Sequence, residues 1–69
     1  MKTEFKFESS TNGIVTAKPE KVILNGVSGN IWTFYGYDKL RNAQNIHLGK
    51  TFMKDKATKE QIKEQFRIM

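Results

Sequence analysis

The stretch that decides the fold runs from Ile31 to Tyr37 and reads Ile-Trp-Thr-Phe-Tyr-Gly-Tyr. It holds four of the eight aromatic residues in the chain, including the only tryptophan. Because β-branched and aromatic residues are enriched in strands, this composition predicts a β-strand. Successive side chains of a strand point to opposite faces, so Trp32 and Phe34 share one face while Tyr35 and Tyr37 share the other. Both faces therefore carry large side chains, and each needs a cover, a partner or a ligand.

A second strand is predicted near the start of the chain. From Lys2 to Glu8, Thr and Phe alternate strictly with charged residues, which is typical of a half-buried strand with one face in water. Asn12-Gly13 then supplies turn residues that tolerate a positive φ. Ile14 to Ala17 is the predicted return strand, and we expect it to end before Pro19 because proline cannot donate to a strand ladder.

The middle of the chain predicts further short strands. Lys21 to Leu24 is a strand closed by Asn25-Gly26, a second hairpin signal. Val27 to Asn30 fits either a brief strand with a bulge or a loop. The turn residues and charges from Asp38 to Asn45 indicate a loop, and Ile46 to Phe52 resumes as a strand interrupted by Gly49.

The last segment changes to a helical period. Thr58 followed by Gln61 fits a capping box, the reciprocal side-chain and backbone bonding that begins a helix. Ile62, Phe66 and Met69 then recur at helical spacing as one apolar stripe. The sequence therefore predicts an α+β fold, an antiparallel β-meander of four to five strands with one C-terminal helix packed on a face, in a single domain over residues 1–69.

Composition excludes several classes of site. The 69 residues contain no cysteine, which excludes disulfides and thiolate zinc sites, and one histidine, His47, does not form a metal site by itself. No Ser/His/acid spacing suggests a catalytic triad, so we expect neither an enzyme nor a cofactor. No signal peptide is evident, and no apolar window approaches the length of a membrane span. We expect a cytoplasmic protein without membrane contact.

The charge distribution is uneven. Charges cancel before Lys39, so the net charge of +5 belongs entirely to the second half of the chain. A pI of about 9.7 favours acidic partners, nucleic acid first. A basic half that follows an aromatic strand is typical of proteins that stack bases on rings and hold phosphates with lysines.

These features predict a nucleic-acid-binding site. Its predicted members are three rings that stack bases, followed by five cations that meet phosphates: Trp32, Tyr35, Tyr37, Lys39, Arg41, Lys50, Lys54 and Lys56. On the predicted helix a basic stripe of Lys59, Lys63 and Arg67 runs beside the apolar one, and we expect the helix glutamates to lie on the far side without neutralising it. The ribonucleoprotein pattern of basic residue, glycine, aromatic residue and glycine is not matched at Phe34 to Tyr37.

Other interpretations of the same residues remain open. Trp32 and Phe34 also fit an ordinary core with tyrosines at its rim, and lysines flank many buried helical stripes. The alternative function is a protein–protein interaction or inhibitor module, of the kind found in phage- or mobile-element-type accessory proteins. Exposed strand edges and Ile68, which falls outside the apolar stripe, favour a homodimer or an acidic or strand-presenting protein partner. A third possibility is capture of a small anionic ligand between subunits.

Overall fold

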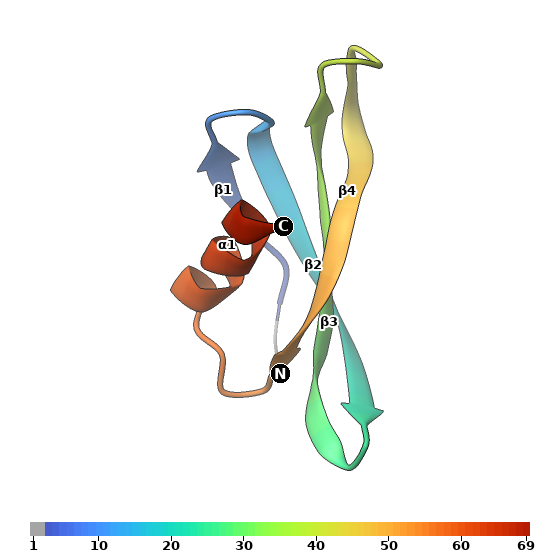
Figure 1. The fold of residues 1–69 in the computed structure, drawn as a ribbon, viewed down its shortest axis with the longest axis vertical. Helices are drawn as coiled ribbons and strands as arrows, with labels where there is room; N and C mark the ends of the chain where they lie inside the picture. The colour runs from blue at the N-terminus through green and yellow to red at the C-terminus, as the bar shows by residue number, and fades with distance from the viewer. Residues whose placement is uncertain (1–2) are drawn as a thin grey trace.

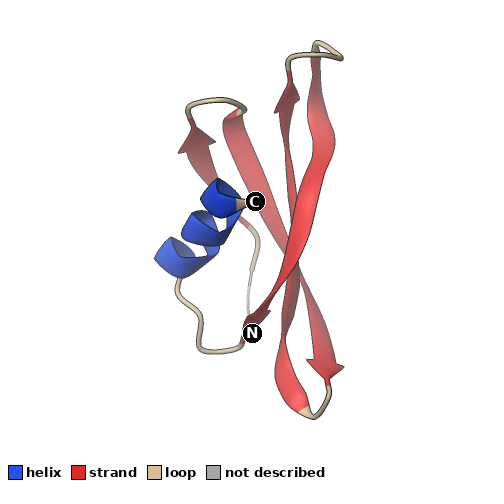
Figure 2. Cartoon of the chain, viewed as in Figure 1, coloured by secondary structure: helices blue, strands red, loops and turns tan. Residues whose placement is uncertain are grey.

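A computed structural model describes residues 3–69 as four strands and one helix. The strands are β1 (Phe5–Ser9), β2 (Gly13–Leu24), β3 (Val27–Asp38) and β4 (Ala43–Lys54), and the helix is α1 (Lys59–Ile68). Each strand pairs antiparallel with its neighbour in chain order, which makes the sheet a β-meander. The helix lies on one side of this sheet, so the predicted α+β fold is confirmed (Figure 1 and Figure 2).

The core lies between α1 and the face of the sheet that carries Trp32 and Phe34. The buried apolar side chains come from β2, β3 and the helical segment: Val15, Ala17, Trp32, Phe34, Ala57 and Ile62. Aromatic rings join the layers, with the Phe34 and Phe66 centroids 5.0 Å apart and those of Phe5 and Trp32 5.4 Å apart. The indole N–H of Trp32 has no hydrogen-bond partner among the described residues, so Trp32 serves this core by its shape and apolar area.

The helix begins with the predicted capping box. Thr58 Oγ1 accepts from the backbone N–H of Gln61 at 3.2 Å, and Gln61 Oε1 accepts from the N–H of Thr58 at 2.9 Å. A ten-residue helix is marginal in isolation. Docking therefore holds it, chiefly through Ile62, which is fully buried, and Phe66, which packs against the core. Burial of one such aliphatic side chain contributes about 1.5–3 kcal/mol.

Two hairpins extend past the helix in opposite directions (Figure 1). At one end β2 and β3 are joined by Asn25 and Gly26, whose φ angles of 50° and 79° fit the predicted tight hairpin turn. At the other end β3 and β4 are joined by a turn over residues 39–42. These extensions give the molecule a long axis of 39 Å against 20 and 19 Å for the others.

The prediction that the second strand ends before Pro19 is wrong. β2 continues through Pro19, which pairs with Trp32 of β3, and runs on to Leu24. The ladder of β1 begins at Phe5 opposite Ala17, so within residues 3–69 one side of β2 has no partner strand from Lys18 onward. A proline is tolerated at such an edge because no neighbouring strand requires its N–H.

Three other boundaries differ from the predicted ones. Residues 27–30, which the sequence left between strand and loop, are the start of β3, because the tight turn holds them against β2. The predicted loop from Asp38 to Asn45 is shorter, because Asp38 already pairs with Ala43. The pairing of β3 with β4 contains shifts of register on the β3 side of this turn. The first strand begins at Phe5, and the predicted strand position Lys2 lies outside the described residues.

The capping box gives a stability prediction. We expect Thr58→Ala to lower the free energy of unfolding by about 1 kcal/mol, because the first turn of α1 loses the acceptor for one backbone N–H. The measurement is urea denaturation followed by Trp32 fluorescence, since the indole lies under the helix. The matched control Thr3→Ala, at an exposed position before β1, should change stability by less than about 0.5 kcal/mol. Equal effects of both variants would contradict a capping role.

Candidate nucleic-acid interface on the open face of the sheet

The sheet face opposite α1 is the candidate functional surface, and we call it the open face. No element of residues 3–69 packs on it (Figure 2). The strand register assigns its members from all four strands: Lys6, Glu8, Ile14, Thr16, Lys18, Glu20, Val22, Leu24, Val27, Ile31, Thr33, Tyr35, His47, Lys50, Phe52 and Lys54. A single-layer sheet with one helix leaves such a face to solvent or to a ligand.

Tyr35 occupies the centre of the open face. It pairs with Thr16 on β2 and with His47 on β4, and its ring is half-buried. The His47 ring meets it edge-on, with centroids 5.9 Å apart and an interplanar angle of 80°. Lys18 Nζ lies over the ring, 5.2 Å from its centroid. Tyr35 is therefore a ring with a cation already placed at its face.

Lysines from three strands surround this ring. Lys18 of β2, Thr33 of β3 and Lys50 of β4 form the next row of the register, and Lys6 of β1 pairs with Thr16. A depression of ≈ 430 Å³ lies beside Tyr35 and is lined by Glu4, Lys6, Thr16, Lys18, Tyr35 and Asn45. The long stems of the lysines let their ammonium groups reach anionic groups above the sheet.

Phe52 adds a second aromatic ring to the open face. It pairs with Ile31, and its ring leans over Gly29 of the neighbouring strand. A Cβ placed on Gly29 would lie 2.6 Å from Cζ of Phe52 and 2.8 Å from its Cε1, so only glycine leaves room for this ring position. The tip of the ring therefore lies against the backbone of β3 at Gly29.

The structure separates the three rings predicted to stack bases. Trp32 is 1% exposed and lies in the core under α1, so it offers no surface to a base and leaves the candidate site. Tyr37 lies at the end of β3, and its hydroxyl donates to Asn42 Oδ1 in the β3–β4 turn. Tyr35 alone of the three lies at the centre of the open face. The strand alternation predicted this division between the two faces.

The predicted cations are spread from the β3–β4 turn to the residues after β4, and they do not form one patch. Lys50 and Lys54 share the open face with Tyr35. Lys39 and Arg41 belong to the β3–β4 turn, where Arg41 Nε lies 3.7 Å from a carboxylate oxygen of Asp38. Lys56 follows β4 and lines a groove between β4 and α1. The turn pair and Lys56 thus belong to other surfaces of the molecule.

The members of the open face that sequence reasoning missed include Lys6, Lys18 and Phe52. Lys18 is 17 residues from Tyr35 in the chain, and only the register of β2 against β3 brings them together. The strand alternation assigned a face to each residue within its own strand. It could not align the strands, because register depends on pairing between distant segments.

The basic stripe of α1 is neutralised in part, contrary to expectation. Lys63 Nζ lies 3.4 Å from Glu60, and Arg67 Nη1 lies 3.1 Å from Glu64, each pair one helical turn apart. Residues three apart are neighbours on a helix, so these glutamates lie beside the cations they were expected to avoid. The helix is therefore a weaker candidate for phosphate contact than the open face.

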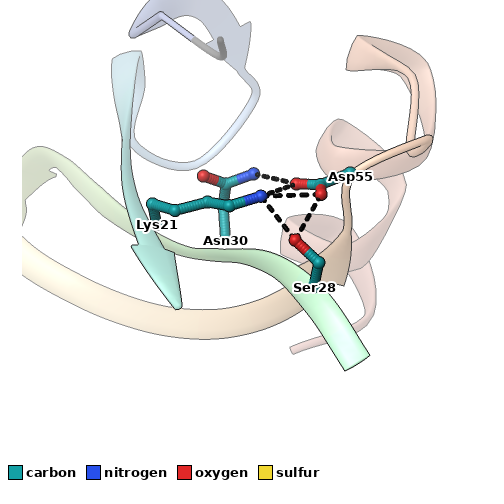
Figure 3. Close-up of polar contacts among 4 residues, drawn as sticks. All are labelled: Lys21, Ser28, Asn30 and Asp55. Carbon is teal, nitrogen blue, oxygen red and sulfur yellow. Dashed lines mark hydrogen bonds and ion pairs between the residues drawn. The ribbon is translucent and has the colours of Figure 1, made fainter. Parts of the chain in front are cut away.

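A polar cluster anchors the base of the β2–β3 hairpin (Figure 3). Lys21 Nζ donates to both carboxylate oxygens of Asp55, at 2.8 and 2.7 Å, and to Ser28 Oγ at 2.6 Å. Ser28 Oγ donates to Asp55 at 2.6 Å, and the amide of the buried Asn30 donates to it at 3.3 Å. These bonds converge on one carboxylate and tie the hairpin to the β4–α1 connection. We assign the cluster a structural role because its bonds join β2, β3 and the residue that follows β4.

We also searched for a metal site, for a membrane-spanning helix and for similarity to known proteins. Within residues 3–69 no group of three or more His, Asp or Glu side chains is placed to hold a metal ion. The same residues form no helix that is both long and apolar enough to cross a membrane. No family model, curated protein or solved structure matches this chain.

The hairpin anchor gives a second stability prediction. We expect Asp55→Ala to lower the free energy of unfolding by about 1–3 kcal/mol, because the buried amide of Asn30 loses an acceptor. The ion pair with Lys21 is largely exposed and adds about 0–1 kcal/mol. Urea denaturation measures the change. Glu64→Ala, which breaks an exposed pair on α1, serves as the control, and an Asp55→Ala loss no larger than that of the control would contradict the anchoring role.

Proposed function

We propose that this chain is a small non-enzymatic protein that binds nucleic acid across the open face of its sheet. The observation that carries the proposal is the ring of Tyr35 at the centre of an uncovered face, with lysines from β1, β2 and β4 around it. A base stacks on an aromatic ring whatever its identity, and lysines beside it hold phosphates. The net charge of +5 favours encounter with a polyanion. We place this function in the cytoplasm, as the sequence predicts.

Lys18 does not block the ring against a base. An exposed cation over an aromatic ring contributes about 0.5–1 kcal/mol. A stacked base contributes about 1–3 kcal/mol, so stacking is the stronger of the two interactions. Lys18 is exposed and flexible enough to swing from the ring to a phosphate, where its charge adds to the affinity. The cation and the base therefore cooperate once a ligand arrives.

The charges of the open face disfavour a second copy of the chain as its occupant. Two such faces packed together would bring the lysines of β2 and β4 against the same lysines of the partner. Desolvating like charges against each other is costly, whereas a polyanion neutralises them. The acidic residue Glu20 is outnumbered by Lys18, Lys50 and Lys54 on these strands. A polyanionic ligand is the better match.

A charge-removal experiment tests the proposal. We expect Lys18→Gln and Lys50→Gln each to weaken binding of a fluorescein-labelled oligothymidylate, and to reduce the slope of log affinity against log salt by about 0.7, the value for one phosphate contact on a single strand. Fluorescence anisotropy between about 50 and 200 mM salt measures the slope. Lys63→Gln on α1 is the control and should leave the slope unchanged. No binding by the native chain at the lower salt concentration would refute the proposed function.

A second candidate function is protein–protein contact through the tip of the β2–β3 hairpin. Three apolar side chains near the tip are exposed, with exposed fractions of 70% for Ile23, 44% for Leu24 and 39% for Val27. Leu24 and Val27 are partners on one face of the hairpin, and Ile23 lies on the other. The hairpin extends beyond the helix (Figure 1), and exposed apolar side chains on a projection are typical of interaction surfaces. A second copy of the chain is the simplest partner.

Self-association tests this second candidate. If the hairpin tip forms a dimer contact, sedimentation equilibrium should show a concentration-dependent dimer for the native chain. The double variant Ile23→Ser, Leu24→Ser should remain a monomer, because it removes most of the apolar area at the tip. Leu40→Ser, at an exposed apolar position of the opposite turn, is the matched control and should still dimerise. A native chain that stays monomeric throughout the concentration range rules out this contact.

A further inference from the structure

We infer that the ligand of the open face is an unpaired, extended single strand that places separate bases on Tyr35 and Phe52. This inference rests on the proposed function. It adds the class of nucleic acid, the strand that its sugar–phosphate backbone follows and a second stacking residue. It follows from the position of Phe52 over Gly29, from the spacing of the two rings and from the charges on either side of them.

Phe52 has the geometry of a stacking platform. Its ring leans over the backbone of Gly29, where no side chain stands beneath it. Phe52 is half-buried, and it also lines the groove between β4 and α1 that contains Lys56. The tip of the ring is held against the sheet at Gly29, and the exposed part of the ring is the surface that we assign to a base. Tyr35 offers a comparable ring on the same face.

The spacing of the two rings excludes neighbouring stacked bases. The ring of Phe52 leans over Gly29, six residues along β3 from Tyr35, which corresponds to about 20 Å at about 3.3 Å per residue. Bases in a duplex strand follow one another at about 3.4 Å and lie face to face. A duplex therefore has no free base faces at this spacing. An extended single strand, with its bases unstacked from each other, reaches both rings.

The charges indicate which side of the strand carries the phosphates. On the β4 side of the two rings stand Lys50 and Lys54, which flank Phe52 in the strand sequence. On the β2 side, the position opposite Ile31 is Glu20, which repels a phosphate. The sugar–phosphate backbone therefore follows β4, and the bases point inward over β3. Near Tyr35 the β2 side is also positive, because Lys18 of β2 lies over the ring, and there Lys18 contacts the phosphate next to the first base from across β3.

A purely structural role for Phe52 gives a different expectation. An aromatic side chain over a glycine also shields the strand backbone, which stabilises the sheet. Leucine at position 52 would keep much of that apolar cover but has no aromatic face. A substitution series at this one position therefore separates stacking from cover.

The experiment compares oligothymidylate and oligouridylate, as single strands and as duplexes with their complements, by fluorescence anisotropy at about 50 mM salt. We expect both single strands to bind more tightly than either duplex. We expect Phe52→Leu and Phe52→Ala each to weaken single-strand binding by roughly 5- to 150-fold, the range for loss of one stacked base, and Phe52→Trp to retain it. Urea denaturation of each variant confirms that Phe52→Leu remains folded.

The outcomes separate the two proposals. If the native chain binds neither single strand nor duplex, the proposed function fails, and this inference fails with it. If it binds but the duplexes bind as tightly as the single strands, the proposed function stands and the single-strand inference is overturned. If Phe52→Leu binds like the native chain while Phe52→Ala does not, Phe52 only covers Gly29 and its stacking role is overturned.

Discussion

The packing of α1 against the aromatic centre of the sheet is the contact on which the rest of this structure depends. Ile62 and Phe66 lie over β3, where Phe34 and Trp32 are fully buried. A chain of 69 residues buries a small core, and this is the main cluster of buried side chains among the described residues. Because the described residues form one helix, that helix covers one face of the sheet. The same contact that stabilises the sheet therefore leaves the other face open, and the candidate function follows from that asymmetry.

Two glycines of β3 permit close packing, one on each face of the sheet. Gly36 lies on the covered face, where a Cβ would approach Leu48 Cδ1 to 3.0 Å, so the close approach it permits serves the core. Gly29 permits a closer approach on the open face, where a Cβ would lie 2.6 Å from Cζ of Phe52. The two glycines therefore relieve crowding on opposite faces of the same strand.

Much of the candidate site depends on strand pairing that no local pattern specifies. The alternation in Ile31 to Tyr37 correctly separated Trp32 from Tyr35, and the charge count correctly placed the excess of cations late in the chain. The partners of Tyr35 could not be predicted in the same way. Lys18 comes from the half of the chain where charges cancel, yet its ammonium lies over the ring. Conversely, Lys39 and Arg41 are close to Tyr35 in the chain but lie in the turn beyond it.

Local sequence patterns predicted the fold class, the start of the helix and the division of the aromatic strand into two faces. These depend on local periodicity, on the capping box at Thr58 and on the Asn25-Gly26 turn, all of which act over a few residues. The tertiary structure alone decided the continuation of β2 through Pro19, the burial of Trp32 and the gathering of lysines around Tyr35. Each of these depends on which distant strand lies alongside, and that choice is made by the packing of the whole sheet against its helix.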